Sequence, residues 1–381
     1  MRYHVLSGID RLDTVARQLS GRRVGLMTNP TGVDHELVST IDRIGRDFRL
    51  TAMFAVEHGI RGDIQAGKAV DTFVDEATGV TVFSAYGKHC HFSDEMLDAF
   101  DVLVFDMQDV GARFYTYLYS LSYAMESCAR AGKDVVVLDR VNPLGGVKRC
   151  GTVLDTRFSS FVGDYELPTQ YALTIGEFAR YVRDYLHLDV DVTVVPLQGW
   201  RREMYLDDTD LPWVAPSPNC PDLAAALCYI GTCIFEGTNL SEGRGTTQPF
   251  QIIGAPFVDG AALEKRMNAL GLEGLHFRRT SFCPMFNKHQ GALCHGVQMH
   301  ITDRERSDVF AGGLYLLDTL RDMYPEQVEF LGKNEQGIYT LDRLLGTNAY
   351  RTGQCSAKAL VEQSREPVRR FGEQTAKYLL Y

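Results

Sequence analysis

The sequence predicts an α/β protein in which a Rossmann-like, doubly wound N-terminal domain precedes a smaller α+β domain. Over the first two thirds of the chain, short β-branched and aromatic runs alternate with helical patterns, which indicates a parallel sheet covered by helices. This alternation changes after Pro256, and 381 residues exceed the usual size of a single core. We therefore expect a catalytic domain over residues 1–252 and an α+β domain over 253–381, with the active-site cleft at the carboxyl ends of the strands, near the domain interface.

The strands of the first domain are expected where apolar runs have strand length and composition. The first run ends in the turn signal Asn29-Pro30-Thr31-Gly32. A three-residue run, Cys233-Ile234-Phe235, precedes a polar loop in the same way, so we assign it to the first domain as another strand. The other expected strands cover residues 24–28, 50–56, 80–84, 101–105, 133–138 and 191–196.

Helices are expected between these strands and after them. Capping patterns at Ser39 and Thr174 open two of them, and Pro221 suits the first position of another. The expected helices cover 9–19, a segment from 39, a short segment from 93, 117–130, 174–187, a segment from about 221, 260–270, 309–322 and two further segments toward the C-terminus. The second domain adds strands near 276–281 and 296–302.

Composition excludes several classes of partner. The net charge is −10, with acids and bases interspersed, which argues against nucleic acid and anionic membranes. Nine cysteines without a CxxC pair favour reduced thiols, and Cys128, Cys228 and Cys233 lie in apolar runs typical of a core. No stretch has the pattern of a signal peptide or the length to span a bilayer. We therefore expect a cytoplasmic protein, with its oligomeric state left open.

The stretch FAVEHGIRGD, residues 54–63, places Glu57 and His58 directly after a buried strand. Open α/β sheets carry their chemistry at this end of their strands. Because Gly59 and Gly62 disfavour a helix, a helical ion pair between Glu57 and Arg61 is a weak explanation. Glu57 is the first candidate for a catalytic acid, and a turn-capping glutamate is the alternative.

Polar clusters at residues 57–58, 106–113, 140–142 and 236–247 would share one edge of a parallel sheet. Their composition suits a sugar, since carboxylates supply acid and base, arginines bind an anion and aromatic rings stack on a pyranose. The candidate rings are Tyr115, Tyr117, Trp200 and Trp213. Asp109 and Arg113 stand at i and i+4, where an ion pair and ligand binding are equally compatible with the spacing.

Rival functions have weaker support. Residues 62–68 have the GxxxxGK spacing of a phosphate loop, but Ala69 replaces the metal-binding serine or threonine and a poor helix follows. Neither GxGxxG nor GxSxG occurs after a strand. The pairs His89/His91 and His295/His300 match no familiar zinc spacing. We expect neither a metal nor a nucleotide cofactor.

Eight segments together resemble the NamZ family of exo-β-N-acetylmuramidases, formerly a domain of unknown function. In order, they are VGLMTNPTGVD, FAVEHGIRGD, VFDMQDVGARFYTYLY, LDRVNPLGG, LPWVAPSPN, FEGTNLSEGRGTTQPFQIIGAPF, GVQMHITD and YLLY, spread from about Gly21 to Tyr381. The resemblance implies a cleft between two domains and the removal of β-1,4-linked N-acetylmuramic acid from the non-reducing end of peptidoglycan fragments, without metal or nucleotide. It assigns the proposed catalytic glutamate of the EHG motif to Glu57.

One stretch departs from the family pattern. Relatives often carry a basic, histidine-containing segment before TIGE, where this chain reads LPTQY at 167–171. If that segment shapes the sugar subsite, the side chain or peptide accepted on the substrate differs here. Many relatives also carry secretion signals.

We therefore interpret the chain as a glycosidase in which Glu57 donates a proton to the leaving oxygen. The second participant is open among three carboxylates and the substrate's own 2-acetamido oxygen. A sugar-binding protein that has lost turnover is the alternative, with a nucleotide hydrolase less favoured. The candidate catalytic residues are Glu57, Asp106, Glu236 and Glu242, and the candidate substrate-binding residues are His58, Arg61, Asp109, Arg113, Tyr117, Asn142, Asn219, Asn239, Arg244 and Thr246.

Overall fold

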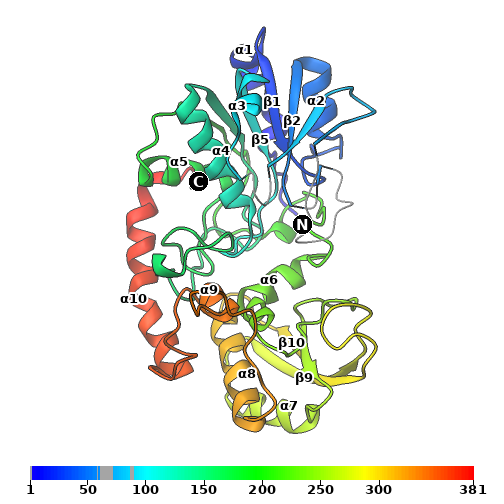
Figure 1. Ribbon diagram of the computed structural model, residues 1–381, viewed down its shortest axis with the longest axis vertical. Coiled ribbons are helices and arrows are strands. Elements are labelled where there is room, and N and C mark those ends of the chain that lie inside the picture. Colours follow the sequence, from blue (N-terminus) through cyan, green and yellow to red (C-terminus); the bar gives the residue numbers. More distant parts are fainter. Residues whose placement is uncertain (1, 58, 61–71, 86–89) are drawn as a thin grey trace.

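Two sheets organise the chain, one in the upper half and one in the lower half of Figure 1. The structure is a computed structural model and describes residues 2–57, 59–60, 72–85 and 90–381. The larger sheet has seven strands in the order β3-β4-β2-β1-β5-β6-β7. They are β1 (Arg23–Thr28), β2 (Arg49–Ala55), β3 (Phe73–Val74), β4 (Thr81–Ser84), β5 (Val102–Asp106), β6 (Asp134–Leu138) and β7 (Val192–Val195).

The larger sheet is parallel except where β3 joins β4 at its edge. From β4 to β7 its order is 3-2-1-4-5-6, that of the doubly wound Rossmann sheet. The point where this order reverses lies between β1 and β5, whose chains pair from Val24 with Val102 to Thr28 with Asp106. The predicted parallel sheet is therefore confirmed, with a two-residue antiparallel edge strand that the sequence did not indicate.

Helices cover both faces of this sheet because side chains alternate along each strand. In β5, Leu103 and Phe105 join the core on one face, whereas Val102 and Val104 join the core on the other. Helices α3 (Asp94–Asp98), α4 (Tyr117–Ala131) and α5 (Ile175–Tyr185) cover the first face, and η1 (Gly8–Val15), α1 (Ala16–Leu19) and α2 (Thr40–Asp47) cover the second.

The capping signals act as the sequence predicts. Ser39 accepts a hydrogen bond from the backbone of Asp42, and Thr174 forms a capping box with Glu177 at the start of α5. Helix α6 (Leu223–Thr232) is capped by Asp222, the residue after Pro221. Pro221 therefore lies just before the N-cap, and its predicted place at the first helical position is wrong. The predicted helix 9–19 is mostly a 3₁₀ helix with a kink at Arg11.

One predicted strand is wrong. The run at Cys233 forms a 3₁₀ helix, η5 (Cys233–Gly237), that directly continues α6. A three-residue apolar run does not distinguish a strand from the end of a buried helix. Glu236 therefore lies within this short helix, and the loop that carries Arg244 follows a helix and not a strand.

The smaller sheet is antiparallel, in the order β8-β10-β9. Strand β8 (Ile252–Ala255) was not predicted, whereas β9 (Leu275–Phe282) and β10 (Cys294–Ile301) confirm the two expected strands. The predicted domain boundary at 252/253 falls at the start of β8. The remaining helices are α7 (Gly260–Ala269), α8 (Val309–Met323), α9 (Thr340–Leu345), α10 (Ala357–Thr375) and the short η3 (Thr156–Phe158), η4 (Leu206–Asp208) and η6 (Ala376–Tyr378).

A single hydrophobic core connects the two halves, and the C-terminus returns to the larger sheet. Helix α10 runs alongside both halves (Figure 1). After α10 and the short helix that follows it, the hydroxyl of the last residue, Tyr381, donates to Oδ2 of Asp139 at 2.7 Å. The predicted core positions Cys128, Cys228 and Cys233 are buried. Within the described ranges, no helix combines the length and apolar character needed to cross a membrane.

Candidate active site

A cavity of about 190 Å³ opens beside the end of β2, with walls from both halves of the chain. Two carboxylates and one guanidinium face it among aromatic and apolar side chains. Such a mixture is typical of ligand pockets, where a few polar groups orient a molecule held by apolar walls. The lining residues are Glu57, Phe114, Tyr115, Thr116, Phe161, Val162, Ser217, Cys220, Tyr229, Glu236, Arg244 and Phe250.

Glu57 reaches this cavity because it follows β2 by two residues, at the carboxyl edge of the parallel sheet. Its carboxylate is half-buried, and Oε2 accepts a hydrogen bond of 3.0 Å from the Thr116 hydroxyl. Thr116 is the N-cap residue of α4, and its side chain makes no capping hydrogen bond to that helix. The Thr116 hydroxyl is therefore available to orient Glu57.

Aromatic side chains form one wall of the cavity. The rings of Tyr115 and Tyr117 lie perpendicular, with centroids 4.9 Å apart. The Tyr117 hydroxyl donates to the Pro216 carbonyl at 2.6 Å, whereas the buried Tyr115 hydroxyl has no hydrogen-bond partner of normal geometry among the described residues. Burial raises the pKa of Tyr115 well above its usual value, so this side chain offers a neutral hydroxyl.

A chain of alternating charges begins at Glu236 and Arg244, which line the cavity, and continues behind them to Glu242 and Lys288. Arg244 lies 2.5 Å from Oε1 of Glu236 and 3.4 Å from Oε1 of Glu242. The other oxygen of Glu242 accepts from Lys288 Nζ at 2.8 Å. Burial favours a lower pKa for Arg244, but Glu236 and Glu242 together raise it above the usual value. Arg244 is thus a permanent cation in the pocket wall.

The other predicted catalytic residues lie outside the cavity lining. Glu242 is almost fully buried between Arg244 and Lys288. Asp106 is fully buried at the end of β5, where it accepts two hydrogen bonds from Arg140, at 2.6 and 2.8 Å, and one from Thr40. Both carboxylates therefore have ion-pair partners inside the protein.

Asp109 and Arg113 do not form an ion pair with each other. Asp109 is buried and accepts from the Tyr171 hydroxyl and from the Gly111 backbone. Burial raises the pKa of Asp109 to about 7, although these hydrogen bonds oppose the rise. Arg113 is fully buried and donates to the Leu344 carbonyl at 2.7 Å, and Nε and Nη1 have no hydrogen-bond partner among the described atoms.

Several predicted binding residues instead stabilise loops. Asn142 donates to the Leu173 carbonyl at 2.9 Å and packs on Gly111, where an added Cβ would come within 2.4 Å of the Asn142 Oδ1 atom. Asn239 bonds the backbone of residues 327 and 329. Thr246 donates to the Gly243 carbonyl within its own loop.

The remaining predicted residues fall into three groups. Asn219 is buried in the turn before α6, and Tyr117 is buried behind Tyr115. Trp200 is buried and its indole nitrogen donates to Met204, so it does not face the cavity. His58, Arg61, the GxxxxGK segment and His89 lie outside the described residues.

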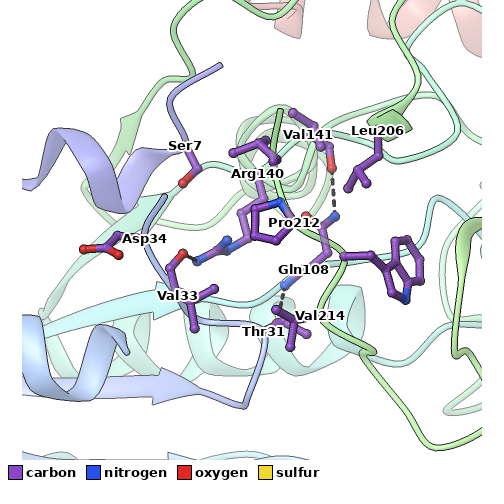
Figure 2. A pocket seen from close by; sticks show the side chains of 12 residues that line it. Ser7, Thr31, Val33, Asp34, Gln108, Arg140, Val141, Leu206, Pro212 and Val214 are labelled. Atoms are coloured by element: carbon purple, nitrogen blue, oxygen red, sulfur yellow. Dashed lines mark hydrogen bonds between the residues drawn. The ribbon is translucent and has the colours of Figure 1, made fainter. Parts of the chain in front are cut away.

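The reversal point of the sheet, where Rossmann proteins bind nucleotides, is filled by side chains (Figure 2). Gln108 donates to the Val141 carbonyl at 2.8 Å, and Arg140 donates to the Val33 carbonyl at 2.9 Å. The remaining cavity is about 20 Å³, enough for about one water molecule. Its lining residues are Ser7, Thr31, Val33, Asp34, Gln108, Arg140, Val141, Leu206, Leu211, Pro212, Trp213 and Val214.

Sequence reasoning missed Thr116, Ser217 and Tyr229 as pocket residues. Thr116 and Ser217 lie in motifs that carried the family resemblance, so a residue-by-residue search of those motifs would have found them. Tyr229 lies on the apolar helix α6, and nothing in its local sequence indicates a pocket. Its ring lies 4.5 Å from that of Phe250, another pocket residue.

Two protein-family models match nearly the whole chain. The model described as exo-beta-N-acetylmuramidase NamZ, N-terminal, matches residues 24–224, and the corresponding C-terminal model matches residues 227–381. The peptidoglycan beta-N-acetylmuramidase NamZ of Bacillus subtilis (strain 168) is 45% identical over 383 aligned positions, which cover 99% of this chain and 91% of that protein.

Two crystal structures of DUF1343 family proteins from Bacteroides fragilis NCTC 9343 have the same fold. One is 34% identical, with a TM-score of 0.92 and all of both chains covered. The other is 30% identical, with a TM-score of 0.76 and 99% of both chains covered. The arrangement of the two sheets is therefore shared by experimentally determined relatives.

Proposed function

This chain belongs to the NamZ family of exo-β-N-acetylmuramidases, a group of glycoside hydrolases, and we propose that Glu57 is the general acid of its hydrolytic reaction. The substrate in this proposal is a peptidoglycan fragment that ends, at its non-reducing end, in β-1,4-linked N-acetylmuramic acid. The scissile bond is the one between this sugar and the following N-acetylglucosamine.

The observation that carries the proposal is the convergence of Glu57 and Glu236 on one cavity. Most glycosidases use two carboxyl groups on either side of the scissile bond. Of the four candidate carboxylates, these two line the cavity, while Asp106 and Glu242 are buried in ion pairs. We place the active-site cleft here, where loops after β2 and before α4 face α6 and the loop that follows η5.

The two carboxyl groups have different surroundings, which suggests different roles. Glu57 accepts one hydrogen bond from the neutral Thr116 hydroxyl, which orients its carboxyl group, and in our proposal Glu57 gives its proton to the leaving oxygen. Glu236 is held in place by the neighbouring cation Arg244. In our proposal Glu236 orients the water or the 2-acetamido group that attacks the anomeric carbon, and Tyr115 donates a hydrogen bond to the bound sugar.

The test is hydrolysis of matched chromogenic glycosides and of the natural disaccharide. We expect release of N-acetylmuramic acid from both muramides and little turnover of the matching N-acetylglucosaminide. The products should be identified by mass, because an exo-acting enzyme releases the single terminal sugar. Binding of the muramide without turnover would contradict the proposal and favour a sugar-binding protein.

A further inference from the structure

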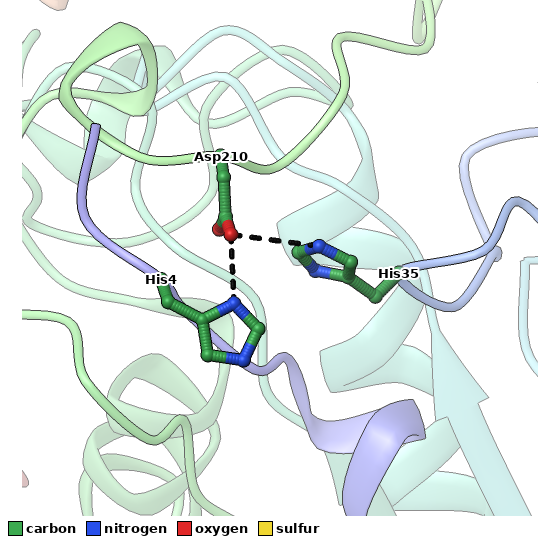
Figure 3. A group of neighbouring side chains, drawn as sticks. All are labelled: His4, His35 and Asp210. Carbon is green, nitrogen blue, oxygen red and sulfur yellow. Dashed lines mark hydrogen bonds and ion pairs between the residues drawn. The ribbon is translucent and has the colours of Figure 1, made fainter. Parts of the chain in front are cut away.

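Three side chains that are far apart in the sequence meet away from the pocket: His4, His35 and Asp210 (Figure 3). Nδ1 of His4 lies 2.7 Å from Oδ2 of Asp210, and Nε2 of His35 lies 3.5 Å from the same oxygen. One potential ligand atom from each residue lies within 4.8 Å of the other two. The N-terminal segment, the loop after β1 and the segment after η4 each contribute one of them.

The backbone holds these residues in place. Asp210 donates its N–H to the Tyr3 carbonyl at 2.9 Å, and its Oδ1 accepts from the Val5 N–H at 3.0 Å. The N–H of His35 donates to Oδ1 of Asp10 at 2.7 Å. These contacts fix the direction of the Asp210 carboxylate and the position of the His35 backbone, and a hydrogen bond to a ligating carboxylate orients it for a metal.

We propose that His4, His35 and Asp210 form a binding site for a divalent transition metal of the zinc type. Two imidazole nitrogens and one carboxylate oxygen are ligands that zinc accepts, whereas magnesium and calcium prefer oxygen alone. Metal–ligand bonds of about 2.0–2.1 Å place the ligand atoms of a tetrahedral site roughly 3.3 Å apart. The two measured separations, 2.7 and 3.5 Å, lie on either side of this value.

The surroundings suit such an ion. The His4 side chain is 68% exposed, so it can rotate by the small amount required and leave a fourth position for water. A bound ion would join three chain segments, one of which continues into the Leu211–Val214 wall of the crevice in Figure 2.

The test is calorimetric titration of the full chain, without a histidine tag, with zinc and separately with magnesium. We expect one zinc per chain and no magnesium binding. His4→Ala, His35→Ala and Asp210→Asn should each weaken zinc binding at least about tenfold, the scale on which changes around a metal site act. Asparagine at position 210 retains an acceptor for the Val5 N–H and removes only the charge.

His187→Asn serves as the matched control. This histidine is exposed and has a φ of +53°, a backbone conformation that asparagine tolerates, so zinc binding should be unchanged. Cobalt absorption spectra supply a second readout, because thiolate ligands give a charge-transfer band that imidazole and carboxylate do not. Zinc affinity unchanged in all three site variants would overturn the proposal, as would loss of binding in Cys283→Ser, which removes an exposed thiol. Since the readout is metal binding, either result leaves the glycosidase proposal untouched.

Discussion

The Thr116 hydroxyl lies 3.0 Å from Oε2 of Glu57. This contact connects the N-cap of α4 to the segment just after β2. The two residues are 59 positions apart in the sequence, and only the parallel pairing of β2, β1 and β5 brings their loops to one edge. A carboxyl group that donates a proton to a leaving oxygen must be held within hydrogen-bond reach of that oxygen. The first two predictions follow from this contact.

Glu57→Gln should lower kcat at least about a hundredfold, the scale of general acid catalysis. Glutamine retains the shape and can still accept from Thr116, so binding of free N-acetylmuramic acid should change little. The loss should be larger for the natural disaccharide than for a nitrophenyl glycoside, because a good leaving group needs less protonation. Glu203→Gln, at an exposed glutamate outside the cavity lining, is the control, and kcat within a few-fold of wild type in Glu57→Gln would remove Glu57 from the catalytic role.

Thr116→Val should lower kcat about tenfold while KM changes little. Valine keeps the branched shape but loses the donor, and a hydrogen bond to a neutral carboxyl group is worth about 0.5–1.5 kcal/mol, or up to roughly tenfold in rate. Because the Thr116 side chain does not cap α4, the helix should keep its stability. Thr116→Ser restores a hydroxyl and should recover most of the activity. If serine and valine lower kcat equally, the methyl packing matters and the hydrogen bond does not.

A third prediction concerns the pH dependence of stability. Burial raises the pKa of Asp109 to about 7, against about 3.9 in an unfolded chain. Between these values the native state binds a proton that the unfolded state has lost, so the Asp109 contribution to stability is present below about pH 4 and falls as the pH rises toward 7. Asp109→Asn does not titrate, so its stability relative to wild type should increase with pH, by at most roughly 1.4 kcal/mol per pH unit.

Urea denaturation midpoints of wild type and Asp109→Asn between pH 4.5 and 7.5 measure this difference. Asp13→Asn, at an exposed position, should show a constant difference from wild type over the same interval. A constant difference for Asp109→Asn as well would mean that Asp109 is ionised in the folded protein throughout this window.

The fold was largely predictable because its signals are local. Strand β5 reads VLVFD, a fully buried run that overlaps the expected strand 101–105. Thr174-Ile175-Gly176-Glu177 opens α5 with the capping box that the sequence shows. Strand β8 was missed because one of its four residues is Gly254, which is unfavourable in a strand pattern. Gly254 lies so close to β10 that a Cβ would meet the His295 carbonyl oxygen at 2.3 Å. Close packing requires a glycine at this position, and the glycine interrupts the apolar pattern from which a strand would have been predicted.

The site was less predictable because ion-pair partners come from distant segments. The local sequence around a carboxylate at a strand end is the same whether its side chain faces a ligand or pairs with a buried arginine. Asp106 is paired with Arg140, and Glu242 with Lys288. The two residues of each pair are too far apart in the sequence for helical or strand spacing to predict the contact. For Glu57, the glycine-rich sequence that follows it and the family motif favour the same residue, and the structure places its side chain in the cavity lining.

The last prediction concerns the selection of muramic acid over N-acetylglucosamine. The two sugars differ by a lactyl ether whose carboxylate is negative at neutral pH, and a fixed arginine binds such a group bidentately. Three arginines were candidates. Arg113 is fully buried, with a guanidinium that donates to the Leu344 carbonyl. Arg244 faces the cavity but already has Glu236 and Glu242 as neighbours, so a third carboxylate there would meet repulsion. Arg61, outside the described residues, remains our choice.

Arg61→Lys should therefore reduce the ratio of kcat/KM for the muramide to that for the glucosaminide, by about 10- to 100-fold. This range corresponds to the 1.5–3 kcal/mol of a charge-assisted hydrogen bond. Arg244→Lys should lower kcat for both substrates alike, because in our proposal it holds Glu236, which both sugars would use. Comparing Arg61→Lys with Arg244→Lys therefore distinguishes recognition of the lactyl group from the positioning of Glu236. A ratio reduced in Arg244→Lys alone would transfer lactyl recognition to the pocket wall, and a ratio unchanged in both variants would assign it to backbone amides of the loop at 241–247.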